Sequence, residues 1–143
     1  MKFLFFAGRE HHAVKLLPLY SGLESQGHEV VFLISDNAIN IDPPTEYIRK
    51  YPVNYIHAMD FLKGIPAANG ISIPGNLSRY IPPFWALFST REALEFIQAT
   101  RNVLQQYSPD RIIVLHSNNF WTRALAYVAQ QEFGIKTYCS QEG

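Results

Sequence analysis

Short apolar runs alternate along the chain with longer stretches in which apolar residues recur at helical spacing. Each run predicts a strand, and the runs lie at Lys2–Ala7, Glu29–Ser35, Val53–His57, Arg111–His116 and Ile135–Cys139. The periodic stretches predict helices over His12–Gln26, Thr45–Lys50, Trp85–Tyr107 and Phe120–Phe133. Because the strand-like runs are apolar throughout instead of alternating, we expect a parallel sheet that is buried on both faces.

This succession predicts an α/β fold: a Rossmann-like, doubly wound parallel sheet of about five strands, with helices on both faces. Right-handed crossovers give the strand order 3-2-1-4-5, with the strands counted along the chain. The 143 residues suit a single domain that covers residues 1–143. The segment Gly64–Pro83 is rich in glycine and proline and predicts a long loop.

Two of the predicted helices have features that the structure can test. Pro18 falls within the first helix, which ends at Gly27, and must lie near the first turn or kink the helix. The long helix is expected to face the sheet with one apolar stripe. That stripe contains Leu87, Leu94, Ile97 and Leu104.

The composition narrows the class of protein. The 12 Lys and Arg residues balance 12 Asp and Glu residues, which argues against a nucleic-acid-binding protein with a basic surface. The single cysteine, Cys139, excludes a disulfide scaffold and favours the reducing cytoplasm. No signal peptide or membrane span is recognisable, so we expect a soluble protein. Charged residues make up 17% of the chain, against about 25% in typical globular proteins, so part of the surface is expected to face a partner.

Ligands of such sheets bind outside the carboxyl ends of the strands, and this rule selects three polar segments. They follow the first, fourth and fifth predicted strands, and we expect them to bind a polar ligand. The candidate binding residues are Gly8, Arg9, Glu10, His11, His116, Asn118, Asn119, Gln141 and Glu142.

The first of these segments does not carry a nucleotide-binding fingerprint. Gly8 stands alone, whereas a dinucleotide loop needs three glycines and a Walker A loop has its own pattern, so no NAD or ATP cofactor is expected. Glu10, His11 and His12 raise the alternative of a metal-dependent hydrolase. Adjacent histidines point in different directions, however, and no further ligand at a metal-binding spacing follows, so we expect no metal.

His12 is the candidate catalytic residue. Imidazole titrates near neutrality, and a position at the start of a helix favours its neutral form, as a general base requires. An orienting carboxylate cannot be assigned from the sequence, although Asp36 or a residue of the His116 segment is a candidate.

The remaining polar candidates allow a structural and a functional interpretation. A lone histidine such as His116 is more often structural, whereas Asn118 and Asn119 either bind hydroxyl groups or cap the following helix. Gln141 and Glu142 either bind sugar hydroxyls or are simply the end of the chain. The apolar segment Ile81–Trp85 either packs its helix onto the sheet or offers a surface to a lipid-linked acceptor, a membrane or a partner domain.

Residues 2–35 resemble the opening of GT-B-fold glycosyltransferases and of the related UDP-N-acetylglucosamine 2-epimerases. The shared features are a strand that ends in glycine, a polar turn and the motif Gly27-His28-Glu29-Val30 followed by Phe32. The stretch Ala13–Leu19 is similar to the start of the first helix in the epimerases, including its proline. Residues 109–143 resemble the region from the fourth to the fifth strand in both groups.

The resemblance implies the amino-terminal, acceptor-side half of a GT-B glycosyltransferase. The donor, a nucleotide sugar, would be held by a carboxyl-terminal domain or partner subunit that this chain lacks, so the chain alone would be inactive. A histidine at the start of the first helix acts as base in many of these enzymes, and counting back from Gly27 places His12 there. An inverting, metal-independent transfer to a sugar or lipid-linked acceptor follows, at the inner face of the membrane or in the cytoplasm.

Some positions depart from the family pattern. Lys15 replaces the proline usual three residues after the histidine. Ser117 and Gln141 stand where the epimerases carry an aspartate and a glutamate, which disfavours epimerase chemistry. The main rival to the glycosyltransferase is a non-catalytic binding module, or a subunit of a two-chain enzyme, that docks through Ile81–Trp85.

Overall fold

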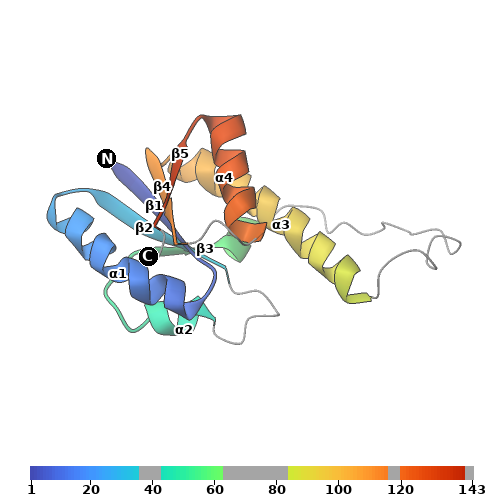
Figure 1. The fold of residues 1–143 in the computed structure, drawn as a ribbon, viewed down its shortest axis with the longest axis horizontal. Helices are drawn as coiled ribbons and strands as arrows, with labels where there is room; N and C mark the ends of the chain where they lie inside the picture. Colours follow the sequence, from blue (N-terminus) through green and yellow to red (C-terminus); the bar gives the residue numbers. More distant parts are fainter. Residues whose placement is uncertain (36–42, 63–83, 116–119, 141–143) are drawn as a thin grey trace, which may run out of the picture.

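The computed structural model describes residues 1–35, 43–62, 84–115 and 120–140 (Figure 1). The side chains of residues 59, 62, 84–93 and 120 are not described. The strands are β1 (Lys2–Ala7), β2 (Glu29–Ile34), β3 (Tyr55–His57), β4 (Arg111–Val114) and β5 (Lys136–Cys139). The helices are α1 (Glu10–Ser25), α2 (Pro44–Ile48), the 3-10 helix η1 (Ala58–Leu62), α3 (Phe84–Tyr107) and α4 (Phe120–Phe133).

The strands form one five-stranded sheet in the order β3-β2-β1-β4-β5, and every pair is parallel. Both the order and the direction confirm the prediction. The central strand β1 pairs with β2 along its whole length and with β4 from Phe3 to Phe6. Four consecutive β1 residues, from Leu4 to Ala7, are at most 1% exposed. The fold is therefore the predicted Rossmann-like α/β sheet.

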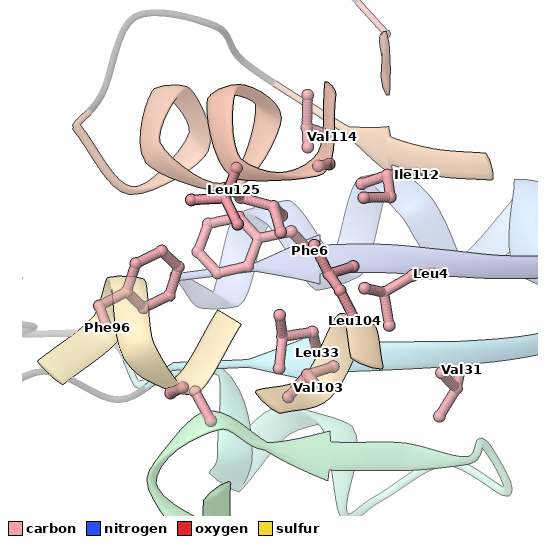
Figure 2. Packing of buried hydrophobic residues seen from close by; sticks show 14 residues of the cluster. Leu4, Phe6, Val31, Leu33, Phe96, Val103, Leu104, Ile112, Val114 and Leu125 are labelled. Atoms are coloured by element: carbon pink, nitrogen blue, oxygen red, sulfur yellow. The ribbon is translucent and has the colours of Figure 1, made fainter. Parts of the chain in front are cut away.

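Helices cover both faces of the sheet (Figure 1). On one face, α3 and α4 pack over a cluster that includes Leu4, Phe6 and Leu104 (Figure 2). Edge-to-face ring contacts connect Phe6 to Phe96 and Phe96 to Trp121, with ring centroids 5.6 and 4.9 Å apart. The strand β1 is thereby linked to both helices of this face.

On the other face, α1 and α2 cover a second cluster built around aromatic rings. Tyr20 of α1 stacks on Phe32 of β2, with centroids 5.4 Å apart, and Phe5 of β1 meets Phe32 edge-on at 5.5 Å. The Tyr20 hydroxyl accepts the backbone N–H of Asn54 at 3.1 Å. Burial raises the pKa of Tyr20 above its usual value, so its phenol stays neutral while it holds the approach to β3 against α1.

Helix α1 begins at Glu10, two residues before the predicted start. Arg9 is extended, with φ −149° and ψ 159°, and its carbonyl already accepts the N–H groups of His12 and Ala13. Pro18 lies in the interior of α1, not near the first turn. Its missing N–H leaves the carbonyl of Val14 without a helical partner, and both residues lie on the exposed side of the helix, where water can serve instead.

Helix α3 faces the sheet with only part of the predicted stripe. Leu104 is buried and Ile97 packs against the same cluster, as expected, but Leu94 is 55% exposed, and the side chain of Leu87 lies outside the described set. The buried positions of the helix are Phe96, Ala99, Thr100, Val103 and Leu104. These residues recur at helical spacing, and the face they form is centred about 200° around the helix axis from Leu94. The prediction was wrong for Leu94, because the helix packs through Phe96 onto Phe6.

The other differences concern the ends of elements. The strands β2, β4 and β5 are shorter than predicted by one or two residues, β3 begins at Tyr55 instead of Val53, and α2 covers Pro44–Ile48 instead of Thr45–Lys50. The 3-10 helix η1 was not predicted. Asn102 of α3 donates a hydrogen bond to the carbonyl of Phe61 at 2.7 Å, which ties η1 to the helix layer.

A bidentate ion pair joins the two helices of one face. Arg101 of α3 donates to both carboxylate oxygens of Glu132 of α4, at 2.7 to 3.0 Å. This hydrogen bonding lowers the pKa of Glu132 below its usual range and raises that of Arg101. The pair lies at the surface, so water and salt screen it.

We expect Leu104→Ala to lower the free energy of unfolding by about 2–5 kcal/mol, because it opens a cavity in the centre of the α3 face. Leu94→Ala in the same helix should change it by less than about 0.5 kcal/mol, since that side chain is mostly exposed. Urea denaturation of both variants measures the difference. Equal effects at the two positions would contradict the register of α3.

Glu132→Gln should lower the midpoint of thermal unfolding near pH 7, because it removes the charge from the pair with Arg101. The folded-state pKa of Glu132 is lowered, so its contribution is complete above the unfolded value of about 4.3 and is lost as the pH falls through the folded value. The gap between the wild type and the variant should therefore close as the pH falls through the folded-state pKa. A gap that persists in acid would show that packing, not charge, is responsible.

Candidate functional site

The carboxyl ends of four strands lie level at one edge of the sheet. The last paired residues are Ala7, Ile34, Val114 and Cys139. Two backbone hydrogen bonds extend the ladder by one step: Ser35 donates to the carbonyl of Ala7 at 3.2 Å, and Ser140 donates to that of Val114 at 2.8 Å. The chain therefore leaves β1, β2, β4 and β5 at the same edge, as the sequence predicts for a ligand site.

The turn between β1 and α1 brings five predicted site residues together at this edge: Gly8, Arg9, Glu10, His11 and His12. Gly8 is the first residue beyond the paired part of β1. Its N–H donates to the Nδ1 atom of His12 at 3.3 Å, which closes the turn. The side chain of Arg9, the N-cap residue, makes no capping hydrogen bond.

His12 itself is almost fully buried, with 5% of its surface exposed. Its ring meets the ring of His11 edge-on, with centroids 4.4 Å apart. Arg9 and Glu10 are exposed, and His11 is half-buried. The turn thus combines a buried imidazole, held by a backbone amide, with charged side chains at the surface.

The other predicted site residues lie outside the described residues. These are His116, Asn118 and Asn119, which follow β4, and Gln141 and Glu142, which follow β5. Their roles, and that of Asp36 as an orienting carboxylate, stay predictions. The role of Ile81–Trp85 as a docking segment also stays a prediction, because residues 81–83 and the side chains of Phe84 and Trp85 lie outside the described set.

Two tyrosines of the α2 region, which were not predicted, lie against each other on the α1 side of the sheet. The rings of Tyr47 and Tyr51 lie 4.8 Å apart, and Tyr47 packs against the cluster beneath α1. A hydrogen bond with Tyr51, followed by burial and by the charges of Tyr51 and Glu10, raises the pKa of Tyr47 to about 12. The phenol of Tyr47 therefore stays neutral near pH 7. The i, i+4 spacing of Tyr47 and Tyr51 is the signal in the sequence that could have shown these tyrosines as a pair.

Among residues 1–35, 43–62, 84–115 and 120–140, no three His, Cys, Asp or Glu side chains gather closely enough to hold a metal ion. Within the same ranges, no helix combines the length and the apolar character needed to cross a bilayer.

Known proteins resemble this chain in structure but not in sequence. No protein-family model and no curated protein sequence matches it. The crystal structure of SsfS6, a glycosyltransferase of Streptomyces sp. SF2575, in complex with thymidine diphosphate matches it with a TM-score of 0.51 at 15% sequence identity. A second crystal structure of SsfS6 matches with a TM-score of 0.52 at 17% identity.

The two alignments cover 99% of this chain but only 38% and 39% of SsfS6. At such low identity the likeness concerns the fold. The chain therefore has the fold of part of a glycosyltransferase, and it spans less than two fifths of that enzyme's length.

We expect His12→Ala to lower the free energy of unfolding by about 1–3 kcal/mol, because it removes the acceptor of the Gly8 N–H at a part-buried site. His12→Asn should have a clearly smaller effect, since the asparagine Oδ1 takes the place of Nδ1. His12→Gln lacks an acceptor at that place and should behave like the alanine variant. Urea denaturation distinguishes the three, and equal losses for Asn and Ala would contradict a stabilising Gly8–His12 hydrogen bond.

Proposed function

We propose that this chain is the acceptor-side, amino-terminal domain of a GT-B-type glycosyltransferase. The enzyme would transfer a sugar from a nucleotide-sugar donor to a hydroxyl group of a sugar or lipid-linked acceptor. The observation that carries the proposal is the likeness to SsfS6 over 99% of the chain, together with a histidine at the turn after β1. The fold alone hosts many activities, so the histidine turn is an essential part of this argument.

A second domain or subunit would hold the donor. The chain spans 38% of SsfS6, which leaves most of a comparable enzyme unaccounted for. In the proposed enzyme, the nucleotide sugar binds to this second domain or subunit and faces the carboxyl edge of the sheet. No resident cofactor is required, because the donor is a substrate.

In the proposed reaction, the acceptor hydroxyl attacks the anomeric carbon of the donor sugar. A new C–O bond forms there while the bond from that carbon to the nucleotide phosphate breaks, and the nucleotide leaves with the electron pair. His12 takes the proton of the hydroxyl group, a role that general bases fill with gains of about 10²–10⁴ in rate. A single displacement of this kind inverts the configuration at the anomeric carbon.

The polar residues around His12 would position the acceptor. Glu10 and His11 lie on the same turn as His12. His116, Asn118, Asn119, Gln141 and Glu142 are proposed as further ligands of hydroxyl groups, because they follow strands that end at this edge. Carboxylate, amide and imidazole groups can each hydrogen-bond a hydroxyl.

The proposal requires a longer natural polypeptide or a tightly bound partner. The mass of the native protein in its source cells, together with the composition of any complex it forms, tests this. A chain that continues by about another domain, or a partner of that size, agrees with the proposal. A natural chain of this length without a partner would favour a binding module instead.

Catalysis is tested in the complete protein, with nucleotide sugars as donors and the released nucleoside diphosphate as the signal. We expect His12→Asn to lower kcat by about 10²–10⁴-fold with little loss of stability, because it keeps an acceptor for Gly8 but no basic nitrogen. The matched control is Leu94→Ala, which alters an exposed side chain of α3 and should leave kcat unchanged. Unchanged turnover in His12→Asn would remove this residue from the mechanism.

A further inference from the structure

The hydrogen bond between Gly8 and His12 determines which nitrogen of the neutral imidazole ring carries the proton. The Gly8 N–H is the donor, so the Nδ1 atom of His12 is the acceptor, at 3.3 Å. A ring nitrogen that accepts an N–H carries no proton of its own. In the neutral ring the proton must then be on Nε2.

We infer that the Ala7–Gly8 peptide is a positioning group, which holds His12 in the tautomer protonated at Nε2 and must turn before this histidine can act as a base at Nε2. The tautomer follows from the hydrogen bond alone. The consequence for sugar transfer rests on the proposed function.

The present orientation of the peptide opposes proton uptake by the ring. A base that receives a proton at Nε2 needs a hydrogen on Nδ1 both before and after the transfer. The Gly8 N–H would then face another N–H, and two donors repel each other. A hydrogen-bond acceptor must replace the Gly8 amide beside Nδ1 for the ring to become a base.

The Ala7–Gly8 peptide itself contains such an acceptor. Turning this unit over would exchange the Gly8 N–H for the Ala7 carbonyl on the side that faces His12. In the present orientation that carbonyl accepts the N–H of Ser35 at 3.2 Å, so the turn breaks two hydrogen bonds and forms a new one. A bound acceptor or the second domain would have to compensate for the difference.

Glycine at position 8 makes this movement feasible. Turning a peptide changes ψ of the first residue and φ of the second, and glycine tolerates the positive φ values that side chains oppose. A Cβ atom at position 8 would also lie 3.3 Å from Cζ of Phe6, a tight contact that the ring of Phe6 would have to relieve. Gly22 of α1 has no atom within 4 Å of such a Cβ and provides a matched control.

The first experiment is nitrogen-15 NMR of the complete protein, labelled at the histidine rings and the glycine amides, at alkaline pH where imidazoles are neutral. We expect an unprotonated Nδ1 in His12, a protonated Nε2, and a scalar coupling across the hydrogen bond to the Gly8 amide nitrogen. The signals of the His12 ring nitrogens are assigned because they are missing from the spectrum of the His12→Asn variant. A protonated Nδ1, or the absence of coupling to Gly8, would overturn the inference whether or not the protein transfers sugars.

The second experiment compares Gly8→Ala with Gly22→Ala in the transfer assay. Alanine at position 8 restricts the turn of the peptide but retains the N–H, so the NMR signature should persist while kcat falls by about tenfold or more. Gly22→Ala should leave kcat unchanged. Equal kcat values in the two variants, with the coupling to Gly8 present in both, would refute the required turn. If the wild type transfers no sugar from any donor, the proposed function fails and the NMR result still decides the tautomer.

Discussion

The burial of β1 on both faces is the constraint on which the rest of the structure depends. This strand is paired on both sides and packed by helices above and below, so its residues from Leu4 to Ala7 are almost completely shielded from water. Polar side chains are excluded from it, and they can return only where the strand ends. That point is Gly8, and the polar turn that follows meets the ends of three further strands. The location of the site is thus a consequence of how the core is built.

The order of the strands could be predicted because it depends on a property of whole segments. Continuous apolar runs require burial on both faces, and right-handed crossovers then leave few arrangements. The facing of α3 depends on single contacts and could not be predicted in this way. Leu94 and Phe96 are both apolar and lie on opposite sides of the helix, and the choice between them is made by the rings of Phe6 and Trp121. Such pairings across the fold leave no local periodicity.

In the candidate site, too, the position of a residue along the fold could be predicted, but its individual contacts could not. The position of His12 at the first turn of α1 follows from the strand that precedes it, and the sequence predicts it. The hydrogen bond from the Gly8 amide depends on a side-chain rotamer and a peptide orientation, which no residue pattern specifies. Tyr47 joins the cluster beneath α1 only because α2 packs against α1, so its place there is a tertiary effect.

A chain can share this fold with SsfS6 at 15% identity because the sheet requires apolar character at each position, not particular side chains. The same tolerance means that the fold carries little information about chemistry. In the proposed enzyme, whether His12 can act as a base depends on which ring nitrogen carries the proton, and we infer that the Gly8 amide determines this. Neither a substitution pattern nor a superposition of Cα atoms can reveal it. The proposed function of this edge therefore depends on the direction in which the Ala7–Gly8 peptide points.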